Sequence, residues 1–559
     1  MTVQAAIEAR AVSYRSRVGE VTVRDISITV GQGELVAIIG GRGSGKTTLL
    51  DALSGLLSPS SGTVLRRPWA ENGTAGARNG GTERRQTGYV PDGDTVHLVL
   101  PLGRALRYSA GLRGVAFPGD GRDGAVEEAL RAVNLAGRAH VSVGDLNPGE
   151  RKRAAIAAEL LAGPAQLFLD EPTAGLDPAQ ATELLRLLRR LSDGGMTVVL
   201  TTSSSLDAGR CDKVAVLATG GHLAFFGTPA GARGYFGADS LEEIYERLAG
   251  LGDPATAWSR RYFQFPRPRA GAAPIPTTPR AAGPAVLVPD AAGPHSAGRP
   301  VPLMPGGDDA RELGVVGADL AEDPARAVTN AVPPQPSALD RAPGARRPAR
   351  QLSVLIGQNA ELVARSRLTR ALLVGAPVAV LLSFALLIAV GAFSSAAAAS
   401  ALLVLGAAGT GLCYGLSHSR EEGGALRTER FAGLSAATYL LARLAVLLPA
   451  LAAADAIVLL VPAACARLPH GYGACYLTVL LSSTTVLALA LLLSVALPGR
   501  PGVVSPRAAV VAPAALFAAA LLSLLDRPAW WTWLLLGAVA VTLMAAVGVT
   551  IARRDPCPH

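Results

Sequence analysis

Residues 40–48 of the chain read Gly-Gly-Arg-Gly-Ser-Gly-Lys-Thr-Thr, between the apolar residues 35–39 and the helix-forming residues 49–53. This order predicts a strand, a phosphate-binding loop and a helix. Glycines let successive backbone N–H groups curl around a phosphate chain, a lysine places its charge on the terminal phosphates, and a threonine hydroxyl can bind Mg²⁺. The loop therefore predicts a nucleoside triphosphate site; a glycine-rich turn that binds nothing is the alternative. The residues assigned to this loop are Gly40, Gly41, Arg42, Gly43, Ser44, Gly45, Lys46, Thr47 and Thr48, with Thr47 as a metal ligand.

Two carboxylates follow a second apolar strand-like stretch, residues 167–169. Asp170 is expected to hold Mg²⁺ through its water shell, and Glu171 to polarise the attacking water. Tyr14 stands on the first strand-like segment, 26 residues before Gly40. Its ring could stack on a nucleobase, or it could be an ordinary strand tyrosine.

The last third of the chain is much more apolar than the rest, in a sequence of 559 residues with 50% hydrophobic content. Its long apolar runs each approach the roughly 20 residues needed to cross a bilayer. They predict six transmembrane helices; a buried helical bundle in a soluble protein is the alternative. The six runs are residues 371–393, 396–416, 440–465, 474–497, 508–525 and 531–552.

Arginine placement predicts the orientation in the membrane. With the N-terminal part in the cytoplasm, most arginines near the helices lie on the inner side, and the outer loops hold Arg467 and Arg527. We expect a multi-pass protein of the plasma membrane with both termini cytoplasmic. No signal peptide is expected, since residues 1–11 lack an apolar core. The net charge of +9 fits this topology. Nucleic-acid binding is not expected, because the sequence has no basic patch with interleaved aromatic residues.

The composition predicts four parts. Residues 1–264 would form the nucleotide-binding domain, with a helical subdomain at about 100–160, and residues 371–559 the transmembrane domain. Residues 265–350 are rich in Pro, Ala and Gly and predict a disordered linker. Residues 351–370 predict an amphipathic connecting helix at the membrane surface, or alternatively an extension of the first transmembrane helix.

The order of these motifs resembles the ATP-binding cassette family. Tyr14 corresponds to the adenine-stacking position, residues 40–47 to Walker A, residues 167–170 to Walker B, Glu171 to the catalytic base and residues 174–177 to the D-loop. Residues 54–62 and 88–91, and a cassette that precedes six helices, are similar to the G-subfamily of half-transporters. The predicted fold class is thus an α/β P-loop NTPase, an ABC cassette, followed by an all-α transmembrane domain.

The resemblance implies a dimer in which two cassettes enclose two ATP molecules with Mg²⁺. Each ATP would be bound by the Walker motifs of one chain and the signature motif of the other. The partner would be a second copy or another half-transporter, and the substrate a hydrophobic small molecule or lipid. Residues 420–430 resemble the subfamily's loop that contacts the cassette.

Three positions depart from the family pattern. Where the signature reads Leu-Ser-Gly-Gly-Gln, residues 146–150 read Leu-Asn-Pro-Gly-Glu. Asn147 and Glu150 predict a capping box that preserves the helix start, and Asn147 and Gly149 remain the residues that could reach the partner's nucleotide. Asp92 replaces the Q-loop glutamine and could still ligate Mg²⁺. Ser203 replaces the switch histidine, without its reach or its titratable ring.

These departures predict ATP binding with slow hydrolysis. Ordinary turnover, supported by Asp92 or another polar group, is the alternative, and the retained Glu171 favours it. The expected function is ATP-driven export of a hydrophobic or amphipathic compound by a dimer. An ATP-binding regulatory or scaffolding membrane subunit is the second candidate, and a soluble cassette acting on the ribosome the third.

Three further residues in the apolar region carry open interpretations. Asp455 lies inside the third apolar run and predicts either a substrate pathway or helix pairing, unless it lies near the outer interface. Cys465 and Cys475 flank an expected outer loop, where they could form a disulfide or remain small apolar residues.

Overall fold

The structure is a computed structural model of the whole chain. It describes residues 4–15, 21–67, 87–93, 95–113, 121–249, 254–264, 347–390, 396–416, 434–465, 471–496 and 529–554. The chain divides into one unit of residues 1–262 and 331–559 and a second of residues 263–330. The description below concerns the first unit. Most of the expected linker, the loop at residues 420–430 and the apolar run at residues 508–525 lie outside the described residues.

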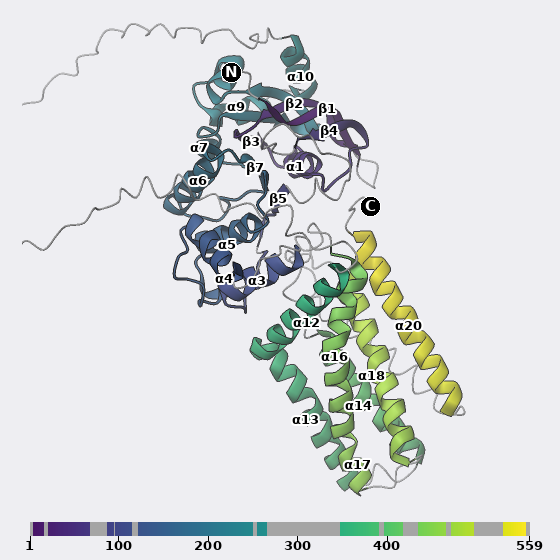
Figure 1. Cartoon of the computed structure of the whole chain (residues 1–559). Helices are drawn as coiled ribbons and strands as arrows, with labels where there is room; N and C mark the ends of the chain where they lie inside the picture. Colours follow the sequence, from purple (N-terminus) through teal and green to yellow (C-terminus); the bar gives the residue numbers. More distant parts are fainter. Residues whose placement is uncertain are drawn as a thin grey trace, which may run out of the picture. The chain divides into compact units, whose positions relative to one another are not determined.

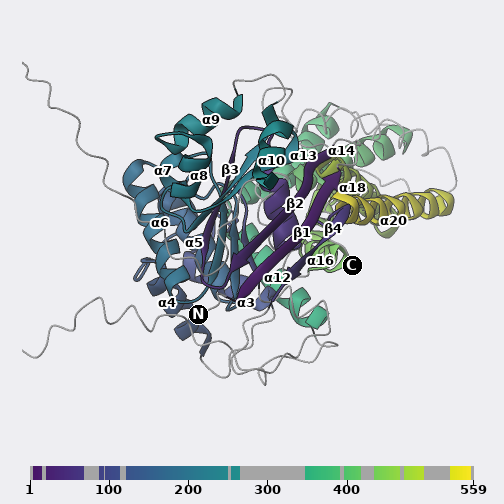
Figure 2. The same ribbon diagram turned by 90° about the horizontal axis from the view of Figure 1, so that it is seen from above.

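A nine-stranded sheet forms the frame of the N-terminal part, in the order β4-β1-β2-β9-β8-β3-β7-β6-β5. Strands β8, β3, β7, β6 and β5 run parallel, whereas β1 pairs antiparallel with β2 and β4. Figure 2 shows β1, β2 and β4 side by side. The bounds are β1 Ala5–Arg15, β2 Val21–Gly31, β3 Leu35–Gly40, β4 Ser61–Arg66, β5 Thr87–Val90, β6 Gln166–Leu169, β7 Thr197–Thr201, β8 Lys213–Ala218 and β9 His222–Gly227.

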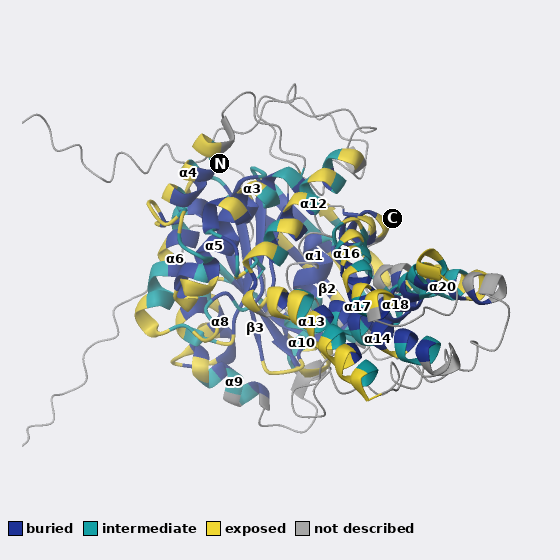
Figure 3. Ribbon diagram, turned by 90° about the horizontal axis from the view of Figure 1, so that it is seen from below, coloured by how far each residue is buried: buried dark blue, intermediate teal, exposed yellow. Residues whose placement is uncertain are grey.

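The parallel strands are short apolar runs because helices cover both faces of this part of the sheet. Every residue of β3, β5, β6 and β7 is buried, and Figure 3 shows the middle of the sheet in the dark blue of buried residues. The predicted strand, loop and helix at residues 35–54 are present as β3, a turn and α1 (Lys46–Ser54). The carboxyl ends of β3, β6 and β7 therefore meet at one edge, where the loops after them carry the candidate site.

Two groups of helices surround the sheet. Helices α3 (Leu102–Leu112), α4 (Gly121–Ala132) and α5 (Pro148–Leu160), with the short η2 (Val143–Asp145), lie together at one end of this region (Figure 1). The others are α6 (Pro178–Asp193), α7 (Ser205–Ala208), α8 (Pro229–Phe236), α9 (Leu241–Ala249) and α10 (Pro254–Gln264), with η3 (Thr219–Gly221) between β8 and β9. One continuous core joins the strands to both groups.

Nearly all described residues of the C-terminal part are helical. Its helices are α12 (Arg347–Arg365), α13 (Arg367–Ala389), α14 (Ala396–Leu416), α16 (Ala436–Val458), α17 (Leu460–Cys465), α18 (Gly471–Ala496) and α20 (Ala529–Arg554). Three stretches are long and apolar enough to cross a membrane: Thr369–Ala389, Ala437–Ala464 and Gly471–Leu492. Shorter apolar stretches lie in α14 and α20. Helices thus occupy five of the six predicted runs, but the count of six membrane spans stays a prediction.

The surface of α13 supports a membrane environment. Its exposed large apolar residues recur every four positions, so they form one stripe along the helix. A stripe of this kind is stable where lipid or another apolar surface covers it. The stripe consists of Val374, Val378, Leu382 and Leu386 on α13 and of Val390, which caps its C-terminus.

The expected connecting helix ends earlier than residue 370. It is α12, and it stops at Arg365 because Ser366 adopts an extended conformation and caps α13 through the N–H of Thr369. Helices α12 and α13 are therefore separate elements. Helix α12 contacts α3. The Tyr108 hydroxyl of α3 donates to Glu361 of α12 at 2.7 Å, and Gln351 of α12 donates to the Leu112 carbonyl of α3 at 2.9 Å.

Candidate functional site

The loop between β3 and α1 has the geometry of a phosphate cradle. Gly45 has a φ of 89°, and a Cβ there would lie 2.3 Å from the Thr22 carbonyl oxygen, so only glycine fits. Helix α1 begins at Lys46, so the N–H groups of its first turn point toward the loop. The Ser44 hydroxyl is buried and has no hydrogen-bond partner among the described residues. A buried donor without a partner fits a phosphate oxygen as its missing acceptor.

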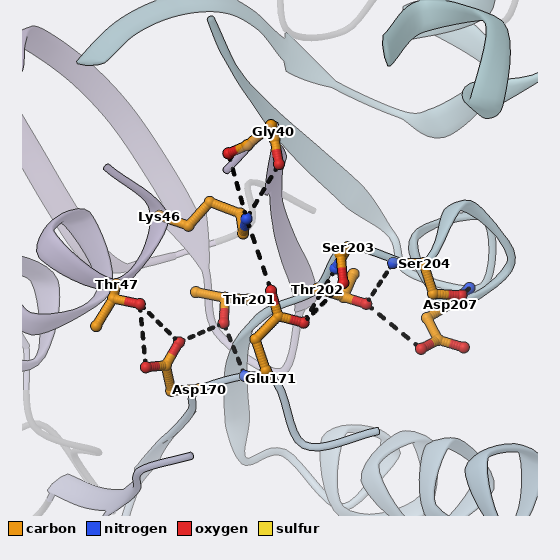
Figure 4. Close-up of polar contacts among 11 residues, drawn as sticks. Gly40, Lys46, Thr47, Asp170, Glu171, Thr201, Thr202, Ser203, Ser204 and Asp207 are labelled. Carbon is orange, nitrogen blue, oxygen red and sulfur yellow. Dashed lines mark hydrogen bonds and ion pairs between the residues drawn. The ribbon is translucent and has the colours of Figure 1, made fainter. Parts of the chain in front are cut away.

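Asp170 and Thr47 form the expected metal-binding pair. The Thr47 hydroxyl lies 3.1 Å from both carboxylate oxygens of Asp170 (Figure 4). Asp170 is buried, and the Thr201 hydroxyl donates to its Oδ1 at 2.6 Å. A carboxylate and a hydroxyl fixed side by side are oxygen ligands of the kind that Mg²⁺ uses together with water and phosphate.

Thr201 is a site residue that the sequence analysis missed. It is the last residue of β7, next to β6 in the sheet, where Leu169 pairs with Leu200. Its hydroxyl both donates to Asp170 and accepts the backbone N–H of Glu171 at 2.8 Å. Finding it needs the strand order. Because neighbouring parallel strands end at the same edge of a sheet, a threonine that ends β7 lies beside the carboxylates that follow β6 once β7 is known to be next to β6.

Glu171 lies between Lys46 and Ser203. Its backbone has a φ of 43°, a conformation that non-glycine residues rarely adopt. Such a conformation persists where the surrounding structure holds the backbone in place, and it is common at active sites. Its Oε1 is 3.6 Å from the Lys46 ammonium nitrogen. Its Oε2 accepts hydrogen bonds from the Ser203 backbone N–H at 3.1 Å and from the Ser203 hydroxyl at 3.2 Å (Figure 4). Lys46 also donates to the Gly40 carbonyl at 3.0 Å.

A second set of polar contacts fixes the loops after β6 and β7 to one another. The Asp207 carboxylate accepts from the hydroxyls of Thr173, at 2.6 Å, and Thr202, at 3.4 Å. The Ser204 side chain accepts the N–H of Asp207 and caps α7. Further along, Asp177 caps α6 through the N–H of Gln180. These contacts hold the segment that carries Ser203 against the segment that carries Glu171.

The altered signature segment forms a well-made helix start. Asn147 and Glu150 make the predicted capping box: the Asn147 side chain accepts the N–H of Glu150, and the Glu150 carboxylate accepts the N–H of Asn147. Pro148 occupies the first helical turn, where its missing N–H costs little. The other oxygen of Glu150 lies 3.1 Å from the Arg138 guanidinium. The negative charge of Glu150 is therefore paired within the same chain.

In the described part of the chain, no contact links Asp92 to Thr47 or to Asp170. Asp92 is mostly exposed, and its Oδ1 lies 3.4 Å from the ammonium of Lys152, which belongs to α5. Asp92 thus links the loop after β5 to α5, the helix that begins within the signature segment. Tyr14 is half-buried on β1, packed against the core, and its stacking on a base stays a prediction.

In the helical part, Asp455 of α16 is fully buried and contacts two neighbouring helices. Its carboxylate accepts from the Thr410 hydroxyl of α14 at 3.2 Å and from the Ser483 hydroxyl of α18 at 2.5 Å. These contacts fit helix pairing better than a place near the outer interface. Cys475 is buried, whereas the side chain of Cys465 is outside the described residues.

Comparison with known proteins adds to this geometry. The family model "ABC transporter" matches residues 23–174. An ABC transporter ATP-binding/permease protein of Mycobacterium tuberculosis is 36% identical over 274 residues, which cover 48% of this chain and 30% of that protein. ATP-binding cassette sub-family G member 5 of Homo sapiens is 36% identical over 226 residues, covering 38% of this chain and 33% of that protein.

The chain thus spans a third or less of the length of these two relatives. A putative ABC transporter ATP-binding protein of Halobacterium salinarum is 35% identical over 215 residues, which cover 38% of this chain and 90% of that protein. The predicted fold class is confirmed for the N-terminal part, a P-loop NTPase with an ABC cassette, and helices follow it. By its cassette, this chain belongs to the ABC transporter family.

Proposed function

We propose that the chain binds MgATP and works as a dimeric half-transporter that exports a hydrophobic or amphipathic compound. The observation that carries the nucleotide part is the joint placement of Lys46, Thr47, Asp170 and Glu171 at the carboxyl edge of the sheet. The buried Ser44 hydroxyl supports phosphate binding, since no residue in the described part of the chain pairs with it. The similarity to a G-subfamily member and to an ATP-binding/permease protein supports the transport part.

The proposed mechanism assigns a task to each of these residues. Lys46 and the N–H groups of the loop bind the terminal phosphates, and Thr47 and Asp170 hold Mg²⁺. A bound Mg²⁺ neutralises charge on the phosphate oxygens. Glu171 orients and polarises the attacking water, and Thr201 fixes both Asp170 and the backbone of Glu171.

The contacts of Ser203 support slow ATP hydrolysis rather than a complete loss of hydrolysis. Ser203 holds the Glu171 carboxylate through two hydrogen bonds, so the base remains oriented. A serine hydroxyl is shorter than an imidazole, however, and does not supply the contact that a histidine would make with the terminal phosphate. Losing such a contributor typically slows a reaction by about 10²–10⁴-fold. We therefore expect hydrolysis that is slow and depends on Glu171.

The signature segment favours binding of the partner's nucleotide through backbone groups. The capping box and Pro148 start α5 in good geometry, so its helix dipole can still attract phosphate. Glu150 adds little repulsion because Arg138 pairs with it. Asn147 and Gly149 are the residues that would face the other cassette's nucleotide in a dimer.

A test of this function uses the full chain purified in lipid bilayers of defined composition. We expect MgATP binding that Lys46→Ala abolishes, and slow ATP hydrolysis that Glu171→Gln lowers by about 100-fold or more. Asp193→Asn is the matched control, because Asp193 is an exposed carboxylate that pairs with Arg189 on α6. Its rate should equal that of the wild type.

The second candidate function, an ATP-binding regulatory or scaffolding subunit, would give binding without Glu171-dependent turnover. Identification of any half-transporter that co-purifies would distinguish a homodimer from a heterodimer. Rapid turnover by the homodimer would contradict slow hydrolysis. Failure of the protein to bind MgATP would contradict both candidates.

A further inference from the structure

One face of α13 stays exposed in the described ranges of the chain. Of the most apolar residues in Thr369–Ala389, only 11% are buried, against 56% in Gly471–Leu492 of α18. Figure 1 shows α13 at one edge of the helical part. Gly375 lies beside Val374 on this face, and no atom of a neighbouring element lies within 4 Å of the place where its Cβ would be. The apolar stripe of α13 can therefore contact molecules other than this chain.

Two arginines extend this face at the end of α13 that adjoins α12. Arg370 stands four positions before Val374, and Arg367 stands seven before it, so both lie on the face of the stripe. Both arginines are exposed. Among the residues that the structure describes, neither guanidinium has an ion-pair partner, whereas the nearby Arg365 pairs with Glu361 at 2.9 Å. The face thus carries two positive charges at one end of an apolar stripe.

The length of α13 places these arginines at the edge of a bilayer. From Arg370 to Val390 the helix rises about 30 Å, at 1.5 Å per residue, and the hydrocarbon core of a bilayer is also about 30 Å thick. With the stripe in the hydrocarbon, both guanidinium groups lie at the level of the lipid headgroups. Guanidinium groups donate well to phosphate oxygens, and basic residues at this level attract anionic lipids.

We propose that Arg367, Arg370 and the stripe bind an anionic phospholipid in the leaflet on the cassette side of the membrane. The acyl chains lie along Val374 and the valines and leucines after it, and the two guanidinium groups hold the phosphate. This end of α13 lies on the cassette side because α12, which precedes it, contacts α3 of the cassette through Tyr108 and Glu361. A zwitterionic lipid carries a positive charge next to its phosphate, so the site favours a lipid with a net negative charge.

A second copy of the chain fits this face less well than a lipid does. A two-fold interface pairs identical patches, so contact through this face would bring the arginines of both copies together. Like charges that face each other across an interface are unfavourable. Helix α13 contains no Asp or Glu that could offset them. The charges of Arg367 and Arg370 therefore favour the lipid.

The test titrates the full chain in detergent micelles with phosphatidylglycerol or phosphatidylcholine and counts the retained lipids by native mass spectrometry. Arg367→Gln combined with Arg370→Gln should weaken phosphatidylglycerol binding about 30-fold, at about fivefold for each arginine. The affinity for phosphatidylcholine should stay at the wild-type value. The matched control is Arg233→Gln on α8, because Arg233 is also exposed and forms no ion pair in the parts of the chain that the structure describes. Its lipid affinities should equal those of the wild type.

Charge-preserving variants and salt separate recognition of the headgroup from damage to the helix. Arg367→Lys combined with Arg370→Lys should retain most of the affinity for phosphatidylglycerol, because the positive charges remain. High salt should reduce the preference for this lipid, since the Debye length falls from about 10 Å at 0.1 M to about 3 Å at 1 M ionic strength. All variants should have the thermal midpoint of the wild type when no lipid is added, because the arginines are exposed.

Four results would overturn the proposal. One is an equal affinity of the wild type and the combined glutamine variant for phosphatidylglycerol. Another is the same loss per charge in Arg233→Gln, which would show an effect of net charge alone. Equally tight binding of soluble glycerol phosphate by the wild type would show a phosphate site that needs no lipid. Dissociation of a dimer by the combined glutamine variant, with unchanged lipid affinity, would assign the face to a second copy.

Discussion

The Glu171 carboxylate accepts hydrogen bonds from both the backbone N–H and the hydroxyl of Ser203, at 3.1 and 3.2 Å. A serine at this position therefore retains one task expected of a switch residue, holding the base. The backbone contact does not depend on the side chain, so it persists whatever residue stands there. What the serine lacks is length, and this distinction leads to two predictions about the same position.

Ser203→Ala should lower kcat for ATP hydrolysis only about two- to tenfold. The change removes one hydroxyl hydrogen bond, worth about 0.5–1.5 kcal/mol, and leaves the backbone N–H on Glu171. Steady-state ATPase rates in lipid bilayers would measure it, with MgATP binding as the control for an intact site. A loss as large as that of Glu171→Gln would show that the Ser203 hydroxyl does more than hold the carboxylate.

Ser203→His should raise kcat by about tenfold or more. An imidazole can reach past Glu171 toward the terminal phosphate, and a polar contributor of this kind is typically worth about 10²–10⁴-fold. The variant should also acquire a pH dependence near the ordinary pKa of histidine, which the wild type would not show. ATPase rates measured between about pH 5.5 and 7.5, one unit to either side of that pKa, would reveal both effects. Equal rates for the variant and the wild type would place the limiting defect elsewhere, for example in the signature segment.

The signature segment gives a separate prediction. Asn147→Ala should destabilise the cassette by about 1 kcal/mol, because it removes the cap of α5. Asn147→Ser should keep most of this stability, since serine is a good cap, and should raise turnover by returning a hydroxyl to the position that faces the partner's nucleotide. Thermal unfolding and ATPase rates of the two variants would separate capping from nucleotide contact. A serine variant that is as unstable as the alanine variant would contradict the capping argument.

The features that sequence could predict are those encoded by neighbouring residues. The phosphate loop needs glycines and a lysine within eight residues, and the capping box needs Asn147 and Glu150 three positions apart, so both can be recognised locally. The end of α12 also carries a local signal, because Ser366 caps α13. The apolar periodicity alone does not show where α12 ends, since apolar residues continue on both sides of Ser366.

The features that sequence could not predict depend on contacts between distant segments. Thr201 joins Asp170 only because β6 and β7 are neighbours in the sheet. Asp207 accepts from the Thr173 hydroxyl although it lies 34 residues further along the chain, beyond the residues that the family model matches. No spacing rule connects these positions, and the long-range packing that brings them together is a property of the whole fold.

Asp455 provides the last prediction, in the helical part. Its partners Thr410 and Ser483 come from two other helices, and all three residues are fully buried. Interhelical hydrogen bonds in a membrane are worth about 0.6–2 kcal/mol each. Asp455→Leu should therefore lower the thermal midpoint of the protein in detergent, whereas Asp455→Asn should change it little, because an amide can both accept from and donate to the two hydroxyls. If Asp455 instead belongs to a substrate pathway, Asp455→Asn would reduce substrate-stimulated ATP hydrolysis while the thermal midpoint stays at the wild-type value, and the helix-pairing role would be wrong.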